Sequence, residues 1–199
     1  RDECRSDYRV ASLMILPIVA FGSPILRKRC IDISPDYPDL DNLLANMWET
    51  MYKAHGVGLA APQINKGIRL FLIDTTPFVE DEKETEKVIL KQAFINARIL
   101  EEVGEEWNFN EGCLSIPEIR EDISRKPSIT IEYMDENFKK HIDTYDGLMA
   151  RVIQHEYDHI DGILFTDKLS ALRKRMIKGK LMDISKGKVD VSYKMRFTR

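Results

Sequence analysis

The sequence predicts an α+β fold, with small mixed or antiparallel sheets around one central helix, a second helix in the N-terminal half and a third near the C-terminus. Strand-like segments cluster before and between two long helical segments, and they do not alternate regularly with helices as in a doubly wound sheet. The 199 residues, 43% of them apolar and 32% charged, are typical of a globular protein and suffice for one domain with a sizeable core.

We expect this domain to span residues 14–199. Residues 1–13 are charged, lack an apolar run of their own and do not begin with methionine, whereas Met14 opens a strand-like segment, MILPIVAF. We therefore expect residues 1–13 to be a leader or an added upstream segment, with a genuine N-terminal extension as the alternative. No apolar run approaches the roughly 18 residues that cross a bilayer. Three cysteines without a disulfide spacing favour a reducing compartment, and hence the cytoplasm.

The first elements follow from apolar spacing. A helix of about four turns is expected from Asp39, ended by Gly56, because apolar residues recur at helical intervals: Leu40, Leu43, Leu44, Met47, Trp48 and Met51. Residues 68–73 read as a short buried strand. The acidic stretch 80–87 lacks any periodicity and reads as a surface loop, and the role of the longer segment 77–87 stays open.

Strands dominate the middle of the chain. A strand pair is expected around residues 94–100 and before Glu111. Ile129, Ile131 and Tyr133 then alternate with polar residues, as in a half-buried strand, and a turn at 135–137 leads into a second strand at 138–145. These two strands should form a hairpin.

Two helices complete the prediction. One runs from Asp146, a favourable N-cap residue, to Gly162, a favourable C-terminal stop. Another is expected over residues 168–183.

The first of these two helices contains HEYDH, residues 155–159. Histidines at i and i+4 lie on one helix face and can meet at one tetrahedral metal, while Glu156 projects beside them to handle a proton. The alternative is an ordinary charged face with two histidines. Leu148 and Val152 lie on the same side as His155 and His159, so that this side should face the core.

Catalytic metal sites usually have a third protein ligand. No histidine follows His159 at the metzincin spacing. Cys113, in EGCLSIPE, is the better candidate, although a free cysteine is more often a small buried hydrophobe. A third segment, GVGLAAPQ at 56–63, has two glycines that allow close backbone approach and an amide donor in Gln63, but alone it reads as a tight turn.

Taken together, GVGLAAPQ, EGCLSIPE and QHEYDH resemble the three signature segments of peptide deformylases, in the same order and spacing, over roughly residues 14–180. The resemblance implies a hydrolase that removes the N-formyl group from the initiator methionine of new polypeptides and releases formate. It implies that Cys113, His155 and His159 hold one divalent ion per chain, natively Fe2+, with Zn2+ or Ni2+ also accommodated.

The resemblance also implies roles around the metal. Glu156 would be the general base, and the Gln63 amide with the Leu114 backbone N–H would meet the developing oxyanion. Gly58 and Leu114 would leave room for a formyl hydrogen but little for a methyl group. The methionine pocket should be lined by four apolar residues: Val57, Ile116, Leu148 and Val152.

Two charged features depart from this apolar environment. Arg151 interrupts the expected lining, and we expect it to point to solvent or to border the pocket rim. Arg125 and Asp158 are placed to pair, bracing the HEYDH helix against a sheet.

Two other functions stay open. A zinc endopeptidase would share the chemistry but cleave internal peptide bonds, and an inactive relative would serve as a ribosome-associated binding module. A net charge of −3 divides into +9 over residues 168–199 and −12 over the rest. This basic segment suggests contact with ribosomal RNA, with an ordinary solvated helix as the alternative. We expect formyl-methionyl nascent peptides and the ribosome as partners, and neither membrane nor DNA.

Overall fold

The computed structural model describes residues 13–79 and 89–198. The expectations for a leader before Leu13 and for an acidic loop at 80–87 fall on residues outside these ranges.

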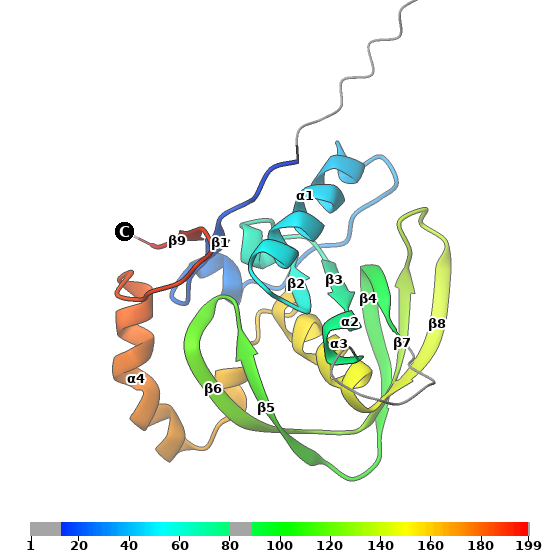
Figure 1. Cartoon of the computed structure of the whole chain (residues 1–199). Coiled ribbons are helices and arrows are strands. Elements are labelled where there is room, and N and C mark those ends of the chain that lie inside the picture. Colours follow the sequence, from blue (N-terminus) through cyan, green and yellow to red (C-terminus); the bar gives the residue numbers. More distant parts are fainter. Residues whose placement is uncertain (1–12, 80–88, 199) are drawn as a thin grey trace, which may run out of the picture.

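The largest sheet has five antiparallel strands in the order β2-β3-β4-β7-β8 (Figure 1). Their bounds are Gly58–Ala60, Leu70–Asp74, Lys91–Val103, Ser128–Met134 and Lys140–Asp146. The buried strand and the hairpin predicted from the sequence are both confirmed. Strand β7 buries Ile129, Ile131 and Tyr133 and leaves the residues between them half-buried, as alternation requires.

A second, two-stranded antiparallel sheet is the long hairpin of β5 (Trp107–Cys113) and β6 (Ile116–Arg125). The predicted pairing of the strand around 94–100 with the strand before Glu111 is therefore wrong. Strand β4 pairs with β3 and β7, and β5 pairs with β6. The segment IPEIREDISR buries about every second residue, and a two-residue connection brings it beside β5 with little loss of chain entropy.

The third sheet joins two segments from opposite ends of the described chain. Strand β1 (Ile18–Val19) pairs in parallel with β9 (Met195–Arg196). The strand expected over MILPIVAF is thus only two residues long, because the backbone before Pro17 bonds to a helix instead. The N–H groups of Met14 and Leu16 donate to the side chains of Asn46 and Thr50.

Three helices of at least fourteen residues are α1 (Leu40–Lys53), α3 (Gly147–Ile160) and α4 (Ala171–Ser185). Short helical segments are α2 (Thr76–Val79) and the 3-10 helices η1 (Pro24–Arg27), η2 (Ala61–Ile64) and η3 (Phe165–Lys168). Helix α4 begins three residues later than predicted, because Lys168 ends η3 and the Ser170 hydroxyl accepts from the Arg173 N–H at 3.3 Å.

The ends of α1 and α3 illustrate how glycine and left-handed residues stop helices. After α1, His55 takes the left-handed conformation (φ 56°) that the sequence suggested for Gly56, and the Gly56 N–H then bonds the Met51 carbonyl. After α3, Gly162 is left-handed as expected (φ 77°). Asp146 is the N-cap of α3, but its side chain makes no capping hydrogen bond.

Helix α3 lies at the centre of the molecule (Figure 1). It contacts β2, β3, β7 and β8 of the large sheet, and its residues Ala150, Ile153 and Ile160 are fully buried. The central helix predicted for HEYDH is therefore confirmed, within the α+β architecture predicted from the sequence. Within the described ranges, no helix is both long and apolar enough to span a membrane.

Candidate metal centre

Three metal-ligating side chains meet between α3 and the β5–β6 hairpin. His155 and His159 lie one turn apart on α3, and Cys113 ends β5. Their ligand atoms all lie within 4.8 Å of one another, and Cys113 Sγ is 3.2 Å from His159 Nε2. One thiolate and two imidazoles converging from two elements are a suitable donor set for a transition-metal ion, with one tetrahedral position left for reaction.

The hydrogen bond behind His155 fits a metal as well, whereas His159 Nδ1 is buried without a hydrogen-bond partner in the described part of the chain. His155 Nδ1 lies 3.0 Å from Glu111 Oε2, which leaves Nε2 to face the cluster. Metal-ligating histidines commonly donate their second N–H to a carboxylate in this way. His159 is 1% exposed, and its Nε2 faces the Cys113 sulfur. The arrangement thus fits one divalent ion held by Cys113, His155 and His159.

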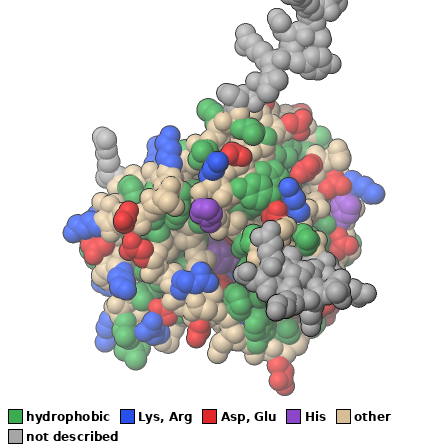
Figure 2. All heavy atoms as spheres, viewed as in Figure 1, with side chains coloured by type: hydrophobic (Ala, Val, Ile, Leu, Met, Phe, Trp, Pro, Cys, Tyr) green, Lys and Arg blue, Asp and Glu red, His purple; other side chains and the backbone are tan. Residues whose placement is uncertain are grey.

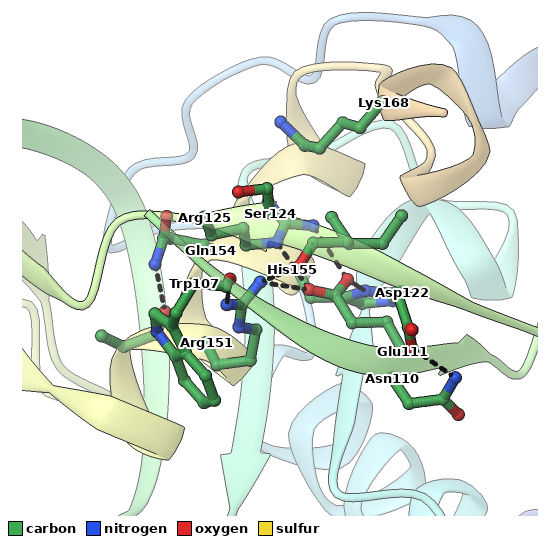
Figure 3. A network of polar contacts seen from close by, with 12 residues as sticks. Trp107, Asn110, Glu111, Asp122, Ser124, Arg125, Arg151, Gln154, His155 and Lys168 are labelled. Carbon is green, nitrogen blue, oxygen red and sulfur yellow. Dashed lines mark hydrogen bonds and ion pairs between the residues drawn. The ribbon is translucent and has the colours of Figure 1, made fainter. Parts of the chain in front are cut away.

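Glu111 is the buried anion behind the cluster, and the sequence analysis missed it. Its carboxylate accepts from Arg125 Nε (2.7 Å) and Nη2 (3.0 Å), from Arg151 Nη1 (3.1 Å), and contacts His155 (Figure 3). Burial alone would raise the pKa of Glu111, but the hydrogen bonds from His155 and Arg125 hold it at about 2. Because Glu111 stays ionised, it can fix the orientation of His155.

Of the two positions expected for Arg151, the one in solvent is wrong, whereas the one beside the pocket agrees with its place among the residues that line the cavity described below. Its side chain is 2% exposed and lies under the β5–β6 hairpin, where it donates to the Trp107 and Ile123 carbonyls at 2.6 and 2.9 Å. Its guanidinium also lies over the Trp107 ring, 4.5 Å from the centroid. The β5–β6 hairpin covers this part of α3. The Arg151 guanidinium therefore donates its hydrogen bonds to carbonyl and carboxylate groups of the hairpin instead of to water.

The predicted pair of Arg125 and Asp158 is confirmed, with Nη1 to Oδ2 at 2.7 Å. Since Arg125 also holds Glu111, this arginine ties α3 to both strands of the hairpin. The candidate ligands on α3 and on β5 are thereby fixed relative to each other.

Glu156 lies beside the ligands and is 5% exposed. Burial raises its pKa to about 7, and its Oε2 has no hydrogen-bond partner among the described residues. Gly58 makes room for it, because a Cβ at that position would lie 2.7 Å from two carbon atoms of the Glu156 side chain. The Glu156 carboxylate lies against the Gly58 backbone, where no side chain intervenes. With a pKa close to neutrality, it is suited to accept a proton.

Gln63 and Leu114 reach the same place from η2 and from the turn between β5 and β6. The Gln63 amide is oriented by the Ala60 N–H, which donates to its Oε1 at 2.8 Å. Its Nε2 lies 3.5 Å from Cys113 Sγ and 3.3 Å from Ser115 Oγ. A fixed N–H donor therefore stands next to the proposed ligands.

A cavity of about 730 Å³ opens above these groups. Histidine side chains are visible in the middle of this face of the molecule in Figure 2. Of the residues expected to form the methionine pocket, Val57, Gly58, Ile116 and Val152 line this cavity. Leu148 is not among the lining residues. Residues 190–193, a segment near the C-terminus that no sequence pattern indicated, line the cavity as well.

A Cys-His-His cluster with a buried carboxylate beside it, at the floor of a cavity and on this α+β framework, defines a metal-dependent hydrolase. The family model described as polypeptide deformylase matches residues 15–175. The chain belongs to the polypeptide deformylase family, and it removes the N-formyl group from the initiator methionine of newly synthesised polypeptides.

Individual relatives agree with the family model. The chain is 64% identical to a peptide deformylase of Christiangramia forsetii over 189 residues, covering 92% of this chain and 96% of the relative. A crystal structure of a peptide deformylase from Legionella pneumophila superimposes with a TM-score of 0.75 at 36% identity, covering 88% and 98% of the two chains. A Plasmodium falciparum peptide deformylase gives a TM-score of 0.75 at 32% identity, over 85% and 95%. The alternative of an endopeptidase from another HExxH family is thereby rejected.

Proposed function

We propose that Cys113, His155 and His159 hold one divalent ion for deformylation and that Glu156, Gln63 and Leu114 perform the remaining chemistry, within a single domain at residues 14–199. The observation that carries the proposal is the convergence of three ligand atoms within 4.8 Å beside the buried Glu156 carboxylate, whose Oε2 has no hydrogen-bond partner among residues 13–79 and 89–198. When bound, such an ion supplies Lewis acidity and lowers the pKa of the attacking water.

The protein groups account for the proton and the developing charge. Glu156 accepts a proton from the water that attacks the formyl carbon, and it delivers that proton to the leaving amine as the C–N bond breaks. Burial suits the carboxylate to both steps, because a pKa near the working pH favours acceptance and release. The Gln63 amide and the Leu114 N–H stabilise the negative charge that develops on the formyl oxygen.

Substrate selection follows from the cavity walls. Gly58 brings backbone close to Glu156, so that little space remains beside the reacting carbon. Together with Leu114, it accommodates a formyl hydrogen and excludes a methyl group. Val57, Ile116 and Val152 receive the methionine side chain. Leu148, half-buried on α3, is not among the residues that line the cavity.

For the native metal we propose Fe2+, as the family resemblance implies. A thiolate with two imidazoles suits ferrous iron and zinc alike, so that the choice of metal is tested by experiment. Protein purified anaerobically is expected to contain about one iron per chain and to hydrolyse formyl-methionyl peptides. In air the iron form is expected to lose most of its activity, since the ferrous ion and its thiolate ligand are open to oxidation. The nickel-exchanged form serves as the control and is expected to persist. Equal stability of all metal forms in air contradicts an iron–thiolate centre.

We further propose that the enzyme acts in the cytoplasm, held near the ribosome by α4. This helix packs on the body through Ile177 and Ile184, and Leu172 and Met176 are 65% and 62% exposed. From the sequence, Leu172, Met176 and Leu181 were expected to face the body, opposite Arg173, Lys174 and Lys178. Leu181 does pack on the body, and Lys174 and Lys178 are exposed. The expectation is wrong for Leu172, Met176 and Arg173. Arg173 instead donates to both carboxylate oxygens of Glu121 on β6.

The outer face of α4 therefore carries Lys174, Arg175 and Lys178, which are exposed and have no ion-pair partner within the described ranges. Exposed cations beside Leu172 and Met176 suit a phosphate backbone, bound through counterion release. Reversing these three charges to Glu is expected to abolish co-sedimentation with ribosomes at low salt and to leave turnover of short formyl peptides unchanged.

Reversing Lys53, Lys66 and Lys139 provides the matched control, since it changes the net charge equally on exposed sites away from α4. In the wild type, the logarithm of the affinity should fall with the logarithm of salt concentration, by about one unit of slope per phosphate contact. The same sedimentation for both triple variants would show that α4 is an ordinary solvated helix.

A further inference from the structure

The end of the described chain folds back over the substrate cavity. Residues 189–196, here called the C-terminal arm, follow α4 and lie beyond residue 175, where the family match ends. Asp190, Val191, Ser192 and Tyr193 of this arm line the same cavity as Cys113 and Glu156. The arm therefore forms part of the substrate site.

The arm is fixed on both sides of Tyr193. Before it, the Asp190 N–H donates to the Glu118 carboxylate at 3.2 Å. After it, the Ile18 and Ala20 N–H groups donate to the carbonyls of Lys194 and Arg196, each at 2.9 Å. Val189, Met195 and Phe197 pack against the core cluster that contains Ile116 and Ile177. The position of Tyr193 is thus determined by contacts along the whole arm.

Tyr193 contacts the turn that follows the cysteine ligand. Its hydroxyl donates to the Leu114 carbonyl at 2.8 Å. Leu114 and Ser115 are the two central residues of the turn that connects β5 to β6, closed by the pairing of Cys113 with Ile116. Neither residue has a positive φ, so that this is not one of the type I′ or II′ turns that two-residue hairpins favour.

The local sequence therefore does little to fix this turn, and contacts from distant segments hold it. The Phe21 N–H donates to the Ser115 carbonyl at 2.8 Å, and Gln63 Nε2 lies 3.3 Å from the Ser115 hydroxyl. Tyr193 holds the remaining carbonyl of the turn. The Leu114 carbonyl and the Leu114 N–H belong to neighbouring planar peptide units that meet at the Leu114 Cα, so that fixing the carbonyl limits the backbone torsions that orient the Leu114 N–H and the preceding Cys113.

We propose that Tyr193 is a positioning residue that sets the orientation of the Cys113 thiolate and of the Leu114 N–H. The inference rests on the proposed roles of Cys113 and Leu114. Small displacements of a group that acts on the transition state reduce the rate more than they reduce substrate binding. The C-terminal arm thus couples the end of the chain to the chemistry.

Tyr193→Phe removes one hydroxyl and keeps the ring. We expect kcat for a short formyl-methionyl peptide to fall about five- to tenfold, the scale of one lost hydrogen bond, with KM changed less than about twofold. In the cobalt-loaded protein, the thiolate-to-metal absorption bands are expected to shift, because the Cys113 sulfur is held less firmly. Tyr37→Phe is the matched control, since its hydroxyl makes no hydrogen bond in the described part of the chain and lies outside the cavity lining.

A Tyr193→Phe variant with the kcat and cobalt spectrum of the wild type would overturn the proposal. The proposal would also be overturned if the cobalt spectrum were unchanged and the fall in kcat were fully explained by a smaller fraction of folded protein, as measured by thermal unfolding. If the wild-type cobalt protein itself showed no thiolate-to-metal bands, Cys113 would not be a metal ligand. That result would contradict the proposed metal site, on which the role of Tyr193 rests.

Discussion

Replacing Glu156 with Gln is expected to leave the metal bound and to lower turnover by about 10²- to 10⁴-fold, the range attributed to a positioned general acid–base group. The reason is that Glu156 lies beside the three ligands without being one of them, and Gln cannot accept the proton of the attacking water. Metal content by elemental analysis and kcat with a formyl-methionyl peptide are the two measurements.

Glu132→Gln provides the control for this substitution. Glu132 is a half-buried carboxylate on β7 that pairs with Lys140 and does not line the cavity. It should keep both metal and activity. A Glu156→Gln protein that lost its metal and recovered full activity on reloading would show that Glu156 holds the ion rather than moving the proton.

Glu111→Gln is expected to give the largest effect on stability. The carboxylate neutralises two buried guanidinium groups, Arg125 and Arg151, and breaking such a buried arrangement costs about 3–5 kcal/mol. Metal affinity should fall about 10- to 100-fold, because His155 loses the partner that orients it. Denaturant unfolding of the metal-free protein and metal competition with a chelator measure the two effects separately.

The matched control is Glu121→Gln on the neighbouring strand. Its partner Arg173 is 45% exposed in its side chain, so that the loss should be about 1 kcal/mol or less, with metal affinity unchanged. Equal losses of unfolding free energy and of metal affinity in the two variants would show that Glu111 neither stabilises the buried arginines nor orients His155.

The pH dependence of stability follows from the same carboxylate. The pKa of Glu111 is about 2 in the folded chain, against an ordinary 4.5. A lowered pKa stabilises the folded state at every pH above the ordinary value, and this contribution is lost as pH falls from about 4.5 toward 2. The wild type should therefore lose unfolding free energy over this window, and Glu111→Gln should lack that component.

Features set by local spacing could be predicted from the sequence. Helix α1 and the HEYDH helix follow from apolar residues at intervals of three and four, and the pair His155 and His159 follows from helix geometry alone. The hairpin of β7 and β8 follows from alternation. In each case the residues that determine the structure lie within about one helix or hairpin of one another.

Most features set by contacts between distant segments were missed or wrong, although the pair of Arg125 and Asp158 was predicted. Arg151 appeared exposed because nothing near it in the sequence shows that Trp107 and Glu111 cover it. A usable signal did exist for Glu111: it stands two residues before Cys113, and alternate residues of a strand share a face. For α4, Ile177, Leu181 and Ile184 have better helical spacing than Leu172, Met176 and Leu181, and Ile177 and Ile184 are the buried ones.

The pairing of β1 with β9 has a consequence for the synthesis of this protein. Strand β9 is translated last among the described elements, and a parallel pair between such distant segments forms late because its loop-closure entropy must first be overcome. The hairpin that carries Cys113 can form earlier, but the arm that holds its turn cannot dock until residue 196 has left the ribosome. An enzyme that deformylates growing chains thus completes its own active site only after its own residue 196 has been translated.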